Sequence, residues 1–156
     1  MKVFELLEEK FILTDFKSYN KEDIINELID LHDEDENVID LELIRSSVLK
    51  REEEQSTGVG EGFAVPHGKC EAVRDILVSF GKSNKPIDYN SLDGQPVHFI
   101  FLIVGEENQV GKYIKLLGRI SRLMNKDDFR QKLIEAKSKS EILKIFEEEE
   151  KNYSDV

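Results

Sequence analysis

The sequence predicts a single-domain α/β protein in which helices flank a mostly buried β-sheet. The chain has 156 residues, a length typical of one domain with one substantial core. Helical patterns occupy the first and last thirds, and two strand-like runs, residues 76–80 and 97–104, lie between them. The second run, VHFIFLIV, is apolar on both alternating faces, as expected of a central strand that is covered on both sides. We therefore predict helices on both faces of one sheet.

Capping residues and apolar spacing define the helices. Asn20 with Asp23, and then Asp40, carry the side chains that cap helix starts, and Ser138 with Glu141 forms a capping box. The expected helices cover residues 20–31, 40–54, 113–124, 129–134 and 138–146. No linker or internal repeat divides the chain, so we expect one domain over residues 1–150 and a C-terminal tail at 151–156.

Glycine and turn residues separate these elements. Residues 57–68, TGVGEGFAVPHG, hold four glycines and a proline, so we expect a loop there rather than a regular helix. Residues 90–94, NSLDG, have the composition of a turn between the two strands.

Charge and composition exclude several classes of function. The net charge of −11 repels nucleic acid phosphates and argues against DNA or RNA binding. The longest apolar run is less than half a membrane span, and the N-terminus lacks a secretory signal. A single cysteine, Cys70, rules out an intrachain disulfide and favours the reducing cytoplasm.

Of the three histidines, His67 has the context most suited to chemistry. It follows Pro66 at the end of the glycine-rich segment, whose open amides can cradle an anion, and an imidazole held rigidly there can act as a nucleophile. From the residues alone, a glycine turn that happens to hold a histidine is an equal alternative. His32 lies among acidic residues and is expected at a solvated surface. His98, inside the apolar strand, is expected to have a satisfied hydrogen bond in or beside the core.

Other site types have little support. The glycine spacing is not that of a dinucleotide-binding motif, so no cofactor is expected. The histidines and the cysteine lack zinc-ligand spacing, so no metal is expected either. Cys70 lies three residues after His67, but a buried, inert cysteine is favoured over a Cys/His hydrolase pair.

The segment from Lys50 to His67, KREEEQSTGVGEGFAVPH, resembles the signature of enzyme IIA of the fructose/mannitol type, in the phosphoenolpyruvate-dependent sugar phosphotransferase system (PTS). The resemblance continues through KPID at 85–88 and LDGQPV at 92–97 to the Leu116-Leu117 helix. It implies a central mixed sheet flanked by helices.

The resemblance also implies a phosphoryl relay. The histidine carrier protein HPr would donate a phosphoryl group to His67, and a cysteine of enzyme IIB would accept it. Association with a membrane IIC component would run through IIB. Arg51 corresponds to the family's phosphate-facing arginine, and its planar fork suits phosphate oxygens. Thr57 would hydrogen-bond the imidazole or the phosphate.

One position departs from the family pattern. Many members carry a second active-site histidine on the helix after the central strand, and Tyr113 stands at that register. Tyrosine supplies a hydroxyl but no cation near neutral pH. We predict that Tyr113 borders the phosphorylation site, with a core aromatic as the alternative.

Two functions therefore stay open. The first is a transferase, the IIA relay subunit of sugar transport. The second is a regulatory module resembling the nitrogen-related branch of the family, in which phosphorylation of His67 controls binding to other proteins. The sugar is not readable from this chain, because specificity in this system resides largely in the membrane component.

Overall fold

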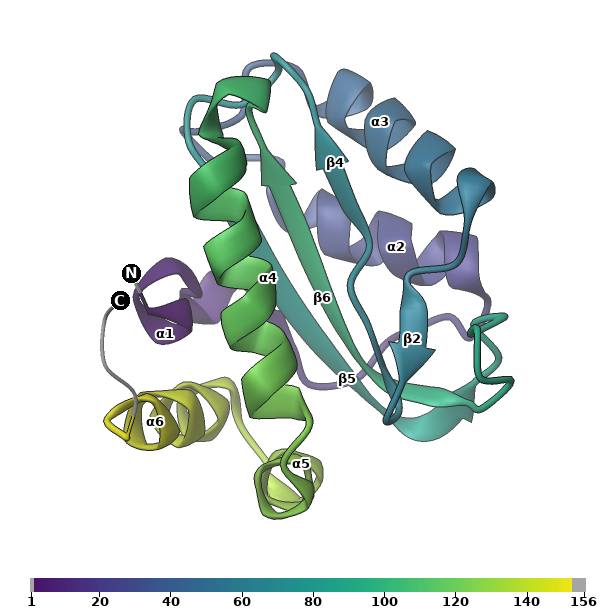
Figure 1. The fold of residues 1–156 in the computed structure, drawn as a ribbon, viewed down its shortest axis with the longest axis vertical. Coiled ribbons are helices and arrows are strands. Elements are labelled where there is room, and N and C mark those ends of the chain that lie inside the picture. The colour runs from purple at the N-terminus through teal and green to yellow at the C-terminus, as the bar shows by residue number, and fades with distance from the viewer. Residues whose placement is uncertain (1, 153–156) are drawn as a thin grey trace.

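Within residues 2–152, which the computed structural model describes, six strands form one mixed β-sheet with helices on both faces (Figure 1). The strands are β1 (Ile12–Leu13), β2 (Gly58–Gly60), β3 (Phe63–Ala64), β4 (His67–Lys69), β5 (Leu77–Ile87) and β6 (Val97–Gly105). Their order is β1-β5-β6-β3-β2, and β4 also pairs with β6. This architecture confirms the predicted fold class.

Strand β6 is the centre of the sheet. It pairs antiparallel with β5, with Phe80 opposite Phe101, and parallel with both β3 and β4. One side of β6 packs Phe99, Phe101 and Ile103 into one core cluster. The other side packs Ile100, Leu102 and Val104 into a second cluster. Burial of both faces explains the continuous apolar run that predicted a central strand.

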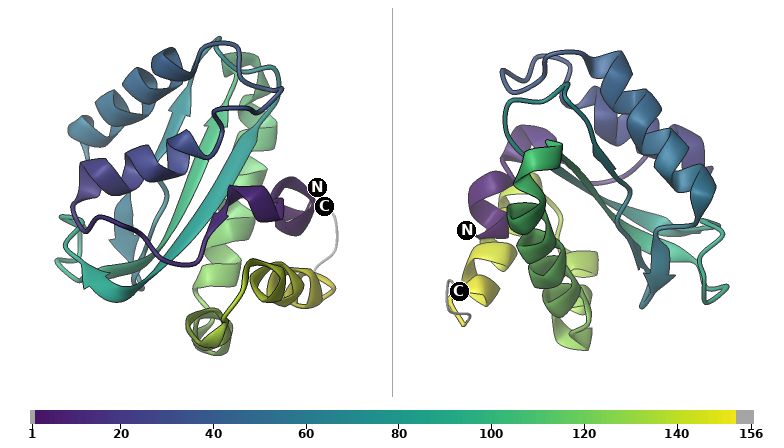
Figure 2. Two further views of the ribbon diagram at one scale, coloured as in Figure 1. Left: turned by 180° about the vertical axis from the view of Figure 1, so that it is seen from behind. Right: turned by 45° about the horizontal axis from the view of Figure 1, so that its top comes forward.

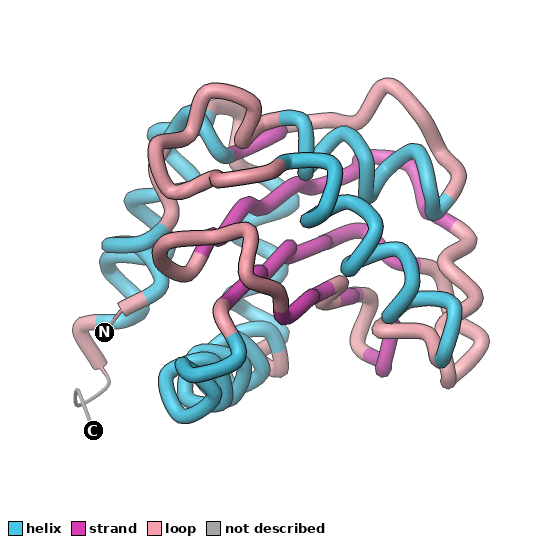
Figure 3. The backbone as a smooth tube through the Cα atoms, turned by 90° about the horizontal axis from the view of Figure 1, so that it is seen from above, coloured by secondary structure: helices cyan, strands magenta, loops and turns pink. Residues whose placement is uncertain are grey.

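The helices divide between these two clusters (Figure 2). They are α1 (Val3–Leu6), α2 (Lys21–Asp30), α3 (Leu41–Glu54), α4 (Val110–Met124), α5 (Asp127–Glu135) and α6 (Lys139–Glu150), with short 3-10 turns at Glu9–Phe11 and Glu107–Gln109. Helices α2 and α3 cover one face, and α1, α4, α5 and α6 cover the other. Seen from above, the sheet lies between two helical layers (Figure 3). In the described part of the chain, no helix is long and apolar enough to cross a membrane.

The predicted helix caps are present. The Asn20 side chain accepts the N–H of Asp23 at 2.9 Å, and Asp40 accepts two N–H groups of the first turn of α3. Ser138 accepts the N–H of Glu141 at 3.1 Å. These bonds satisfy amide donors that the helix itself leaves unpaired, which is why the starts of α2, α3 and α6 were readable from the sequence.

The glycine-rich segment is not the loop that the sequence predicted. It contains β2, β3 and β4, because a tight hairpin turn through Gly60, Glu61 and Gly62, all with positive φ, returns the chain to the sheet. Strands β3 and β4 then pair in parallel with β6, and His67 lies opposite Ile103. His67 is therefore the first residue of a short strand beside the central strand.

The two ends of the described chain are held together. Glu150, at the end of α6, is buried and accepts the backbone N–H groups of Val3 and Phe4, both at 2.8 Å. Arg119 lies 3.5 Å from the same carboxylate. Helices α1 and α6 consequently lie side by side, on the side of the molecule away from α3 and β4 (Figure 1). Residues 153–156 of the expected tail lie outside the described residues.

Candidate functional site

His67 is held with one ring nitrogen occupied. It is half-buried at the start of β4, and its Nδ1 lies 2.7 Å from the carbonyl oxygen of Val65. Because a carbonyl only accepts hydrogen bonds, this contact places a proton on Nδ1 and leaves the lone pair on Nε2. Pro66, between the two residues, has a fixed φ and stiffens this local geometry.

The charges around His67 favour its neutral form. Burial lowers the pKa of His67, and the positive charges of Arg51 and Lys69 lower it further. The Val65 carbonyl and the Glu52 carboxylate act in the opposite direction but do not cancel the effect. A histidine with a lowered pKa is unprotonated at neutral pH, so Nε2 is available as a nucleophile.

A cavity of about 340 Å³ opens beside His67. Its lining residues come from α3 and β4 and are Ser47, Lys50, Arg51, Glu54, His67, Gly68 and Lys69. Three cations face one carboxylate there, although the whole chain has a net charge of −11. The cavity is thus a locally basic site that suits an anion.

The structure brings Arg51 and His67 together, as the sequence predicted. Arg51 lies in the last turn of α3, where its Nη1 donates to the carbonyl of Gln55 at 2.8 Å. This bond fixes the guanidinium at the cavity. Its other N–H groups have no partner among the described residues and are available to a bound anion.

Thr57 is placed differently from the expectation that it bonds the imidazole. It is buried, and its hydroxyl bonds the carboxylate of Glu52 and, at 3.1 Å, the hydroxyl of Tyr89. Glu52 also accepts the N–H of Thr57 at 2.7 Å and the hydroxyl of Tyr89 at 2.5 Å. Thr57 therefore ties the start of the glycine segment to the end of α3, and a direct role in phosphoryl transfer stays a prediction.

Glu52 is the residue that sequence reasoning missed. It stands in a run of three glutamates that reads as a solvated helix face, yet it is only 7% exposed whereas Glu53 beside it is exposed. Lys21 of α2 pairs with it at 3.1 Å and lies over the ring of Tyr89. The helical positions 44, 48 and 52 are buried together, and this spacing is the signal that could have identified it.

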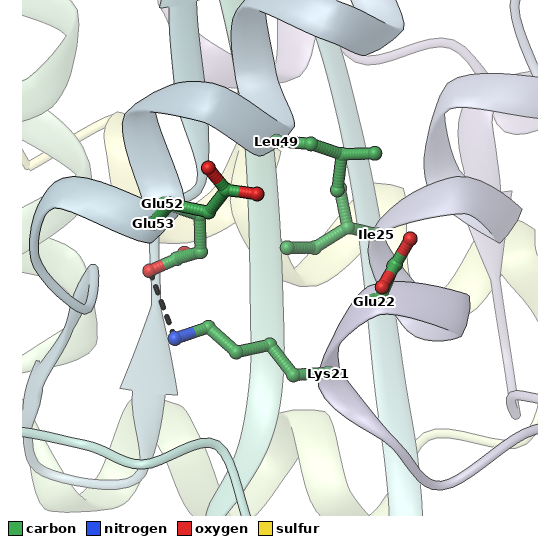
Figure 4. Close-up of a pocket in the computed structure, with 6 residues that line it drawn as sticks. All are labelled: Lys21, Glu22, Ile25, Leu49, Glu52 and Glu53. Carbon is green, nitrogen blue, oxygen red and sulfur yellow. Dashed lines mark ion pairs between the residues drawn. The ribbon is translucent and has the colours of Figure 1, made fainter.

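A second cavity, of about 240 Å³, lies between α2 and α3, and Figure 4 shows the residues that line it. It is lined by Lys21, Glu22, Ile25, Leu49, Glu52 and Glu53. It shares no lining residue with the His67 cavity, and the only base it presents, Lys21, is already paired with Glu52. The His67 cavity is therefore the better candidate for anion chemistry.

Tyr113 lies beside His67, as predicted. It is the fourth residue of α4, and its ring meets the imidazole edge-on with 5.7 Å between centroids. The side chain is 3% exposed, and its hydroxyl has no hydrogen-bond partner among the described residues. Burial raises the pKa of Tyr113, so the phenol stays protonated. Its contribution to the reaction remains a prediction.

The other two histidines lie outside this cavity. His98 is half-buried in β6, and its Nδ1 contacts the carbonyl of Ser83 at 3.0 Å, as expected for a satisfied histidine. The surface prediction for His32 is wrong: the residue is 1% exposed, stacks on Phe11 and bonds Asp35 at 2.8 Å. The turn after α2 folds back onto the core, which buries this ring among acidic neighbours.

The single cysteine and the acidic residues offer little chemistry. Cys70 is half-buried, and burial raises the pKa of its thiol, which disfavours the reactive thiolate. Among residues 2–152, no group of three or more His, Cys, Asp or Glu side chains is arranged to hold a metal ion.

Comparison with known proteins finds a family match over most of the chain. Residues 5–149 match the family described as "Phosphoenolpyruvate-dependent sugar phosphotransferase system, EIIA 2". The chain is 36% identical over 151 residues to the PTS system fructose-specific EIIABC component of Bacillus subtilis, in a match that covers 97% of this chain but 24% of that protein. It is 34% identical over 128 residues to the PTS system fructose-specific EIIA component of Haloferax volcanii, covering 82% and 83% of the two chains.

A solved structure extends the comparison to a regulatory protein. The crystal structure of the nitrogen regulatory protein IIA-Ntr from Neisseria meningitidis superposes with a TM-score of 0.85 at 26% identity. The match covers 92% of this chain and 98% of that one. The proteins similar to this chain thus include ones named as fructose-specific PTS components and one named as a nitrogen regulatory protein.

Proposed function

Because the chain belongs to the EIIA 2 family of the phosphoenolpyruvate-dependent sugar phosphotransferase system, we propose that it is a phosphoryl carrier that uses Nε2 of His67. The observation that carries this proposal is the 2.7 Å contact between Nδ1 and the Val65 carbonyl, inside a cavity that Arg51 lines. It supports a neutral imidazole with a single free nitrogen next to a fixed cation.

The donor in this proposal is the histidine carrier protein HPr. The lone pair of Nε2 forms a new P–N bond, while the bond between phosphorus and the donor's nitrogen breaks and the donor keeps that electron pair. The proton on Nδ1 stays there throughout, donated to the Val65 carbonyl. Arg51 stabilises the charge on the equatorial oxygens, which is the main contribution a protein can make to phosphoryl transfer.

The acceptor is a cysteine of enzyme IIB. Its thiolate attacks phosphorus, the P–Nε2 bond breaks, and the electron pair returns to Nε2. The Bacillus subtilis relative is named as an EIIABC component, which supports a IIB partner for a chain of this family. We propose that both partners meet this chain in the cytoplasm, and that any contact with a membrane IIC component runs through IIB.

A regulatory module is the second candidate, and the fit to IIA-Ntr supports it. In that case phosphorylation of the same nitrogen would change the charge of the basic cavity and, with it, the affinity for other proteins. The chemistry of the first step is identical in the two proposals. They differ in the fate of the phosphoryl group once it is on His67.

Incubation with phosphoenolpyruvate, enzyme I and HPr, followed by intact mass measurement, tests the carrier proposal. We expect one acid-labile, base-stable phosphoryl group in the native chain and in a His98→Ala control, and none in His67→Ala. Labelling that persists in His67→Ala, or that maps to His98, would contradict the assignment. Subsequent addition of a fructose-type IIB separates the two functions, because a transport subunit loses its label to the IIB cysteine and a regulator keeps it.

A further inference from the structure

Lys69 shares the His67 cavity and lies on the same strand. The two residues are separated by one position on β4, so their side chains leave the strand on the same side. The Lys69 Nζ lies 5.2 Å from the centroid of the Tyr113 ring, and that same ring meets the imidazole of His67 edge-on. Tyr113 is therefore an aromatic contact that the lysine and the histidine share.

The ammonium of Lys69 has no carboxylate partner among the described residues. Lys21 pairs with Glu52 and Lys112 with Asp75, whereas Lys50 lines the cavity from α3 and has neither a carboxylate partner nor an aromatic ring beneath it among the described residues. The Lys69 ammonium lies over the face of the Tyr113 ring, and Lys69 also lines the His67 cavity. The ring holds the ammonium in place without neutralising its charge. It remains free to bind an anion that enters the cavity.

We propose that Lys69 is a second phosphate-binding cation beside Arg51, and that the Tyr113 ring positions its ammonium when the phosphoryl group is absent. This inference rests on the proposed function of His67. An ammonium is a compact point charge on a flexible stem, so it follows a phosphoryl group that arrives and leaves, whereas the planar guanidinium of Arg51 provides fixed, directional donors. A dianionic phosphoryl group attracts the ammonium more strongly than a ring quadrupole does, so Nζ moves from the ring to an oxygen.

The electrostatics of the unphosphorylated protein agree with this placement. The charge of Lys69 already contributes to the lowered pKa of His67, although it ranks below burial and Arg51 as a cause. Loss of that charge should therefore be measurable at the imidazole before any phosphoryl group is present.

The test uses phosphoramidate as the donor, because a small molecule removes protein docking from the measurement. We expect Lys69→Gln to slow phosphorylation of His67 about tenfold, the effect of one charge-assisted hydrogen bond at a partly exposed site. Lys69→Arg should stay within about threefold of the native rate because it retains the charge. Lys115→Gln, an exposed α4 substitution with the same loss of charge, should phosphorylate at the native rate.

An NMR titration of the His67 ring in the unphosphorylated proteins is the second readout. We expect the pKa of His67 to rise in Lys69→Gln and to stay unchanged in Lys115→Gln. A native phosphorylation rate in Lys69→Gln, or an unmoved His67 pKa, overturns the role of Lys69 while the carrier function stands. Failure of the native chain to accept a phosphoryl group at His67 instead overturns the carrier function, and this inference with it.

Discussion

The buried carboxylate of Glu52 gives the sharpest test of how the site is held together. It accepts the Thr57 N–H at 2.7 Å and the Tyr89 hydroxyl at 2.5 Å, bonds the Thr57 hydroxyl, and pairs with Lys21 at 3.1 Å. A Glu52→Gln substitution keeps the shape but turns an N–H donor toward groups that themselves donate. Hydrogen bonds to a charged group contribute roughly 1.5–3 kcal/mol each.

The expected loss of stability comes from these contacts. Breaking a buried ion pair costs about 3–5 kcal/mol, but Lys21 retains 22% side-chain exposure, so water compensates for part of its loss. We therefore expect Glu52→Gln to lower the free energy of unfolding by about 3 kcal/mol. For a chain of this size, that corresponds to a fall in Tm of roughly 6–12 °C.

Urea denaturation followed by circular dichroism at pH 7 measures this loss. Glu53→Gln, one residue along on the exposed face of α3, is the matched control and should stay within about 0.5 kcal/mol of the native protein. A loss below about 1 kcal/mol for Glu52→Gln would show that the carboxylate network contributes little, and the reasoning from burial and hydrogen bonding would be wrong.

Three further predictions concern the chemistry at His67. Arg51→Ala should fold normally but accept a phosphoryl group on the order of a thousandfold more slowly, and Arg51→Lys should recover only part of the rate; a native rate in Arg51→Ala would reduce the residue to surface charge. Tyr113→Phe should slow phosphoryl acceptance about two- to fivefold, because the hydroxyl would no longer bond a phosphate oxygen. The Tm should stay unchanged, because this hydroxyl has no hydrogen-bond partner in the described part of the unphosphorylated structure. A native rate in Tyr113→Phe would show that Tyr113 is only a core aromatic. Since burial and Arg51 lower the pKa of His67 below its ordinary 6.5, the acceptance rate should fall as Nε2 gains a proton, with a midpoint below pH 6.5; an NMR titration midpoint above 6.5 would contradict this.

Features set by local chemistry were predictable from the sequence. The caps at Asn20, Asp40 and Ser138 depend on side chains that bond backbone groups two or three residues away, so their positions fix the helix starts. The doubly buried strand β6 was equally readable, because both of its faces carry apolar residues. The resemblance to the family signature predicted that Arg51 and His67 act at one site, and both residues line one cavity. The helical spacing of α3 alone did not predict that Arg51 lies near His67.

Features set by distant packing were not predictable. Glu52 is buried because Tyr89 and Lys21, which are remote in sequence, supply its partners; its helical spacing from Ile44 and Val48 indicates the buried face of α3, but the KREEE run does not reveal which groups pair with the carboxylate. His32 reads as a surface residue from its acidic neighbours but packs on Phe11. The short strands β3 and β4 pair with β6, and β2 pairs with β3, a long-range arrangement that local glycine content conceals.

The Glu150 carboxylate that clasps the N–H groups of Val3 and Phe4 has a consequence for how this unit can be combined with others. It brings the entry and exit of the chain to a single place, on the opposite side of the molecule from α3 and β4 (Figure 1). A unit whose ends meet away from the face that carries the His67 cavity can be joined to further polypeptide at either end without obstructing that face. The matched region is 24% of the Bacillus subtilis protein and 17% of the multiphosphoryl transfer protein of Shigella flexneri, so a region similar to this chain is part of a longer polypeptide in both.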